Sequence, residues 1–194
     1  MKKATTIDEQ IELYKNRNCE LDKKITTNWK DYHFCDLREE KTFINEQPQI
    51  LEKCETAESA LFVLKNVLLR DKDEKIILTP IGEIKILEKF LPHIVEKRLD
   101  ARERYANFVF PTLTNPYEIW EIQDEFAVKR RYISLFNGKR DFMVIIKFFN
   151  DGSIFWNMMH CSRKDMNSHR QGSPIYKKAG DKQYLISLIV GSEQ

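Results

Sequence analysis

The spacing of apolar residues predicts helices in the first part of the chain. Apolar residues recur with helical spacing over residues 6–32, which predicts an amphipathic helix. The spacing is lost over 33–56, a connecting region, and returns over 56–68, where Thr56 and Ser59 are available as N-caps.

A third helix, amphipathic like the first, is expected over residues 87–105. Its polar stripe contains His93, and the two prolines of the segment 108–116 are expected to end it.

A two-residue alternation, typical of strands, appears in the remaining chain. Residues 75–86 form two short apolar runs around a Pro/Gly turn, which predicts a hairpin. Four further strands are expected at 117–123, 128–136, 142–149 and 153–161, and a fifth at 175–176 or 184–190. Asn-Gly and Asp-Gly turns between these strands favour antiparallel pairing. We therefore expect an α+β fold, with helices packed against a curved four- to five-stranded antiparallel sheet.

Length and composition indicate one globular unit with a smaller element. The chain has 194 residues, 42% of them hydrophobic and 32% charged. We divide it into an acidic helical segment, 1–60, and a main domain, 61–194. No apolar run is long enough for a membrane span, and four scattered cysteines suggest neither a zinc site nor a disulfide framework. These features predict a protein of the cytoplasm.

The charge is distributed unevenly. The net charge of +2 combines −3 over residues 1–60 with +8 over residues 129–178. The basic C-terminal third is therefore a candidate for binding a polyanion.

His93 is the first candidate for chemistry, because it lies one helical turn before Lys97 and an imidazole near cations suits general acid/base work. An ordinary surface or half-buried histidine is the alternative. The nearby cations Lys97, Arg98, Arg102 and Arg104 could hold a phosphate, or could form a solvated face paired with acids.

Other polar and aromatic residues could contact a nucleic acid. A proline-bracketed segment carries Thr112, Thr114 and Asn115, which could contact a phosphate, although turn and cap formation is the favoured explanation. Cations and aromatic residues are mixed in the strand region at Arg131, Tyr132, Lys139, Arg140, Phe155 and Trp156, although core packing is expected to take most of the aromatic rings. His160 and His169 are alternative acid/base residues. No HExxH, GxSxG, Walker or GxGxxG motif occurs, so neither metal nor cofactor is predicted.

Three runs then resemble a known family. They are residues 93–98 (His-Ile-Val-Glu-Lys-Arg), 102–105 (Arg-Glu-Arg-Tyr) and 112–120 (Thr-Leu-Thr-Asn-Pro-Tyr-Glu-Ile-Trp), with support from 79–82, 131–133 and 170–176. Over about residues 75–178 the chain resembles the phage-associated nucleases of the barnase, EndoU, colicin and RelE-like group. The resemblance implies a metal-independent RNase site on the concave side of the sheet, in a toxin or effector carried by a phage or mobile element.

The resemblance also implies roles for individual residues. His93 would be the acid/base residue, Lys97 and Arg102 would stabilise phosphate, Thr112 would be a polar site residue, and Arg170 and Tyr176 would close the site. RNA binding is assigned to Arg98, Arg104, Asn115, Arg131, Tyr132, Lys139 and Asn157. Asn157 stands where the family pattern suggests Ser or Thr, so an inactive or repurposed member is also compatible with the sequence.

We therefore expect an endoribonuclease that forms a 2′,3′-cyclic phosphate, with transfer RNA as one candidate substrate and an immunity or antitoxin protein as a candidate partner. The alternatives are a non-catalytic RNA-binding or phage-particle-associated protein on the same fold, and a purely structural interaction module.

Overall fold

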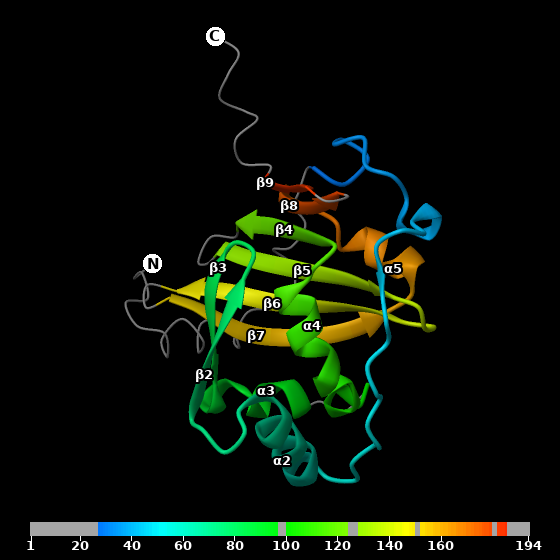
Figure 1. Cartoon of the computed structure of the whole chain (residues 1–194). Coiled ribbons are helices and arrows are strands. Elements are labelled where there is room, and N and C mark those ends of the chain that lie inside the picture. The colour runs from blue at the N-terminus through cyan, green and yellow to red at the C-terminus, as the bar shows by residue number, and fades with distance from the viewer. Residues whose placement is uncertain (1–26, 97–99, 124–127, 150–151, 180–181, 186–194) are drawn as a thin grey trace.

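The sheet is the centre of the molecule, and α2, α3 and α4 lie on one of its faces (Figure 1). The computed structural model describes residues 27–96, 100–123, 128–149, 152–179 and 182–185. The described strands are β1 (Ile44–Asn45), β2 (Glu74–Thr79), β3 (Gly82–Leu87), β4 (Glu118–Gln123), β5 (Val128–Phe136), β6 (Asp141–Phe149), β7 (Gly152–Cys161), β8 (Ser173–Ala179) and β9 (Lys182–Leu185). The described helices are η2 (Leu37–Glu39), α2 (Ala57–Leu68), η3 (Glu88–Phe90), α3 (Pro92–Val95), η4 (Arg102–Phe108), α4 (Val109–Thr114) and α5 (Arg163–Ser168).

The nine strands form one mixed sheet in the order β2-β3-β7-β6-β5-β4-β8-β9, and β1 pairs with the end of β5. Neighbours run antiparallel except for β3 with β7 and β1 with β5. The expected α+β class and the antiparallel meander from β4 to β7 are confirmed. The sheet is larger than expected, because the β2–β3 hairpin joins β7 and because both proposed positions of a fifth strand contain a strand, β8 and β9.

Alternation along the strands feeds a separate hydrophobic core on each face. On the face covered by α2 and α4, Tyr132 and Phe142 pack with Leu64 and Leu113. The opposite face carries Ile133, Leu135 and Met143, which pack against Leu37 of η2 and Met166 of α5. The segment 27–45 is thus attached to the sheet through its own core, while the division at residue 60 stays a prediction.

The helix expected over 87–105 is wrong, because three short helices occupy this region. Ala101 has a left-handed backbone, with φ of +45°, and Tyr105 leaves the helical region at φ −103° and ψ 15°. Either conformation stops a continuous α-helix.

The proline break expected over 108–116 is also wrong, because α4 runs through Pro111. Pro111 is the third residue of α4, where the backbone N–H has no partner within a helix, so a proline costs little there.

The helix expected over 56–68 is confirmed by α2. Thr56 and Ser59 form a reciprocal capping box at its start. The helix expected over 6–32 lies mostly outside the described residues, and its described end is wrong, because Asn28 bridges to Gln171 and a turn follows. Within the described part of the chain, no helix is long and apolar enough to cross a membrane.

Candidate nucleic-acid site

A β-bulge in β7 places two adjacent side chains against two different segments. Asn157 lies opposite Ile145 of β6 and Phe155 lies opposite Ile146, so Trp156 is the extra residue of the bulge. Bulges of this kind redirect side chains and are common beside active sites. Here the bulge brings Trp156 to α3 and Asn157 to η4.

His93 of α3 stacks on the indole of Trp156, with the ring centroids 4.3 Å apart. Its Nε2 is buried and makes no hydrogen bond within the described residues. Burial lowers the pKa of His93, backbone hydrogen bonds at Trp156 and Phe90 oppose this change, and the charge of Lys147 adds to the lowering. The imidazole is therefore neutral at pH 7, the state that a general base requires.

Arg102 of η4 reaches the neighbouring residue of the bulge. Its Nη1 donates a hydrogen bond of 2.7 Å to Asn157 Oδ1, and its Nε pairs with Asp100 at 2.7 Å. The left-handed turn at Ala101 lets Asp100 and Arg102 approach each other. The side chain of Arg102 is 22% exposed, so a guanidinium held in place remains accessible to an anion.

Further cations lie on the same side of the sheet. Lys147 Nζ is 3.6 Å from the centroid of the Trp156 ring, and Lys129 lies directly opposite Lys147 in the β5–β6 ladder. Arg131 lies opposite Ile145, which is itself opposite Asn157. Lys147 and Lys129 are buried, at 1% and 8% exposed, and Arg131 Nη1 donates to His169 O, so these cations lie beneath the surface at the bulge.

Comparison with known proteins supports a function on nucleic acid. Residues 63–177 match the family model described as phage-Barnase-EndoU-ColicinE5/D-RelE like nuclease2. The chain belongs to this nuclease family. No curated protein and no solved structure matches the chain. The resemblance found in the sequence is confirmed, and a nuclease of this family takes a nucleic acid as its substrate.

The matched region of the nuclease contains His93, Arg102 and Asn157, which the structure brings together through the β7 bulge. Lys97 and Arg98 lie outside the described residues. Lys147, which lies against the Trp156 ring and is 1% exposed, was not among the predicted site residues, although it interrupts the apolar run of residues 143–149.

Arg170 lies elsewhere in the nuclease, in a buried ion cluster. Its Nε and Nη2 donate to both oxygens of Glu118 at 2.7 and 2.8 Å, and both side chains are 0% exposed. Its Nη1 donates to Cys35 O and Asn167 Oδ1. Lys177 Nζ completes the cluster at 3.2 Å from Glu118. All these contacts are structural, so the closing role implied for Arg170 stays a prediction that its burial does not favour.

Three other predicted site residues are buried inside the protein. Tyr176 is buried on the face covered by α2 and α4, Tyr132 places its hydroxyl 3.2 Å from Thr79 Oγ1, and the fully buried Thr112 has no partner for Oγ1 among the described residues. None of these contacts involves the β7 bulge.

The remaining predicted residues form other contacts or lie at the surface. Arg131 Nη1 donates to His169 O, Arg104 Nε donates to Leu51 O, and Asn115 bonds to Asn45 and Lys178. Lys139 is exposed between β5 and β6.

His160 is the nearest alternative histidine. It lies on β7 opposite Phe142, and its ring centroid is 3.9 Å from that of Tyr105. Its Nδ1 is buried without a hydrogen bond inside the described portion, and its pKa is lowered by burial and then by Arg140. Because β7 side chains alternate, His160 faces the core shared with Phe142, whereas Asn157 faces Ile145.

Over the described ranges, no group of three or more His, Cys, Asp or Glu side chains could hold a metal ion.

Proposed function

We propose that this nuclease cleaves RNA without a metal ion, by transesterification to a 2′,3′-cyclic phosphate. The observation that carries the proposal is the pairing of a neutral histidine with a held arginine at one bulge, His93 on Trp156 and Arg102 on Asn157. These two groups supply a base and a cation, which are the minimum needed for this reaction.

In the proposed step, Nε2 of His93 takes the proton of a ribose 2′-hydroxyl. The 2′-oxygen forms a bond to the adjacent phosphorus, and the bond from phosphorus to the 5′-oxygen breaks. The leaving 5′-oxygen takes a proton from water, and His93 returns its proton to water. Arg102 offsets the charge that develops on the non-bridging oxygens, while Asn157 holds the guanidinium in place.

The first experiment incubates the purified protein with total RNA in EDTA and identifies the ends of the fragments. We expect 2′,3′-cyclic phosphate and 5′-hydroxyl ends. An oligonucleotide with a single 2′-deoxyribose at the cleaved position should resist cleavage, because it lacks the attacking oxygen.

Variants then test the residues. His93→Gln and Arg102→Met should each lower the cleavage rate by roughly 10²-fold or more, and Asn157→Ala by a smaller factor. A matched control is His33→Asn, since His33 is exposed and has a φ of +55° that asparagine tolerates. Full activity of folded His93→Gln would refute the role of His93.

The rival function is RNA binding without cleavage. It is favoured by the burial of His93 Nε2, because a base must reach its substrate. Intact RNA in every reaction, together with tight and strongly salt-dependent binding, would establish the rival.

A toxin or effector role, transfer RNA as the target and an immunity protein are further parts of the proposal. Growth arrest on expression, lost in Arg102→Met, would support the toxin role. Sequencing of the cleaved RNA ends would identify the target.

A further inference from the structure

The outer edge of β2 is open and apolar. Of the described strands, only β3 pairs with β2, so one side of β2 has no neighbouring strand. Ile76 and Leu78 are 52% and 72% exposed. Natural edge strands are often protected by an exposed lysine, but Lys75 instead lies over the Phe110 ring at 4.0 Å. The exposed side chains Ile76 and Leu78 therefore leave the middle of β2 without a charge that would discourage the addition of another strand.

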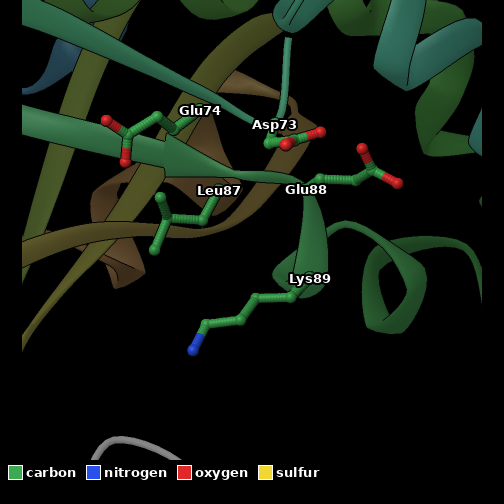
Figure 2. Close-up of a pocket in the computed structure, with 5 residues that line it drawn as sticks. All are labelled: Asp73, Glu74, Leu87, Glu88 and Lys89. Carbon is green, nitrogen blue, oxygen red and sulfur yellow. The ribbon is translucent and has the colours of Figure 1, made fainter.

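An acidic pocket of about 590 Å³ lies at the beginning of the same strand, lined by Asp73, Glu74, Leu87, Glu88 and Lys89. Figure 2 shows Lys89 extending away from the three carboxylates. Glu88 is paired with Lys65, whereas the carboxylates of Asp73 and Glu74 make no hydrogen bond or ion pair within the described residues. Two negative charges thus remain available beside an apolar edge.

An apolar strand edge beside an acidic pocket favours one class of ligand. The carboxylates of Asp73 and Glu74 repel a nucleic acid, and a ligand with apolar side chains alone would leave these negative charges without a cation. A protein strand satisfies both features when it carries apolar residues for Ile76 and Leu78 and a Lys or Arg for the pocket. Its backbone would also pair with the open edge.

A second copy of the chain fits less well. Antiparallel pairing of two β2 strands centred on Ile77 would place Ile76 opposite Leu78 of the other copy. The same register would place Glu74 opposite Pro80, so the pocket would receive no cation.

We propose that β2 is the docking edge for a protein segment that adds a strand to the sheet and inserts a basic side chain into the pocket lined by Asp73 and Glu74. The edge is close to the nuclease site, because Leu87 of the pocket packs on Phe90 and Trp156. The proposal does not depend on which nucleic acid the nuclease cleaves.

The test uses two synthetic peptides that alternate valine with lysine or valine with glutamate. Affinity for the full-length protein is measured by fluorescence anisotropy, and the binding position by amide chemical shifts. We expect the lysine peptide to bind at least about tenfold more tightly than the glutamate peptide, with shifts at residues 73–79.

Three variants complete the test. Asp73→Lys combined with Glu74→Lys should reverse the preference between the peptides, and Leu78→Lys should weaken the binding of both. Phe62→Lys is the matched control, because Phe62 is 65% exposed on α2 and not on the edge strand, and it should change nothing.

Equal affinity for the two peptides, shifts confined to other residues, or a preference that survives the charge reversal would each overturn the proposal. A dimer that forms without peptide and is abolished by Leu78→Lys would assign the edge to a second copy, and would overturn it as well.

Discussion

Replacement of Arg170 by methionine should lower the free energy of unfolding by about 3–5 kcal/mol. The variant leaves the Glu118 carboxylate, which is 0% exposed, without the guanidinium that binds both of its oxygens. It also removes the Arg170 Nη1 donor from Cys35 O and from Asn167 Oδ1, which then keeps only the Leu37 N–H at 3.3 Å. Methionine fills much of the volume, so lost charge pairing and not a cavity accounts for the effect.

The donors that remain on Glu118 decide where the expected loss of free energy lies within this range. Lys177 Nζ, at 3.2 Å, and the Trp120 indole N–H, at 2.8 Å, still contact Glu118 in the variant. They stabilise part of the charge, which places the expected loss near the lower limit, about 3 kcal/mol. For a chain of this size, the melting temperature should fall by roughly 6–12 °C.

Urea unfolding followed by tryptophan fluorescence measures this loss, since Trp120 is part of the cluster. The double variant Glu118→Gln with Arg170→Met should recover part of it, because the uncompensated charge is removed. A loss below about 1 kcal/mol, as for an exposed ion pair, would refute the reasoning. If unfolding were unchanged and cleavage fell instead, the catalytic role implied by the family resemblance would be supported.

Two further predictions concern pH and backbone geometry. Burial lowers the pKa of His93, so protons bind preferentially to the unfolded state, and the free energy of unfolding should fall as the pH decreases below about 6.5. Urea unfolding at pH 7.5 and at pH 5.5 measures this fall, which should be smaller for His93→Gln than for the unsubstituted protein. Equal falls in the two proteins would contradict the prediction. Gly172→Ala should destabilise the fold by more than about 1 kcal/mol, because φ is +90° and the new Cβ would lie 2.3 Å from Glu121 O; an unchanged urea midpoint would contradict this.

Local sequence signals predicted the elements that depend on local physics. The turn at Asn137 and Gly138 joins β5 to β6, and the capping pair Thr56 and Ser59 begins α2. The prolines misled the prediction because their effect depends on position: Pro111 costs little in the first turn of α4. The left-handed conformation of Ala101 has no signal in its residue type, since alanine favours a helix.

Long-range contacts were beyond the sequence. The parallel contact of β3 with β7 rests on a single register pair, Lys85 with Ile154, which no local pattern encodes. Arg170 was predicted as a site residue because the sequence alone does not distinguish an arginine that binds a phosphate from one that binds a buried carboxylate. His93, Arg102 and Asn157 stay predicted site residues; the resemblance supplied their order along the chain, and the fold places them at one bulge.

The ion cluster of Glu118 also sets an order of events during synthesis. Glu118 lies on β4, whereas its partners Arg170 and Lys177 are made 52 and 59 residues later. While the ribosome is still making the segment between them, the β4 carboxylate has no cation and the sheet lacks β8. The half of the sheet beyond β5 therefore closes only after β8 (Ser173–Ala179) has been made, so a chain that stops before β8 does not contain the complete nuclease fold.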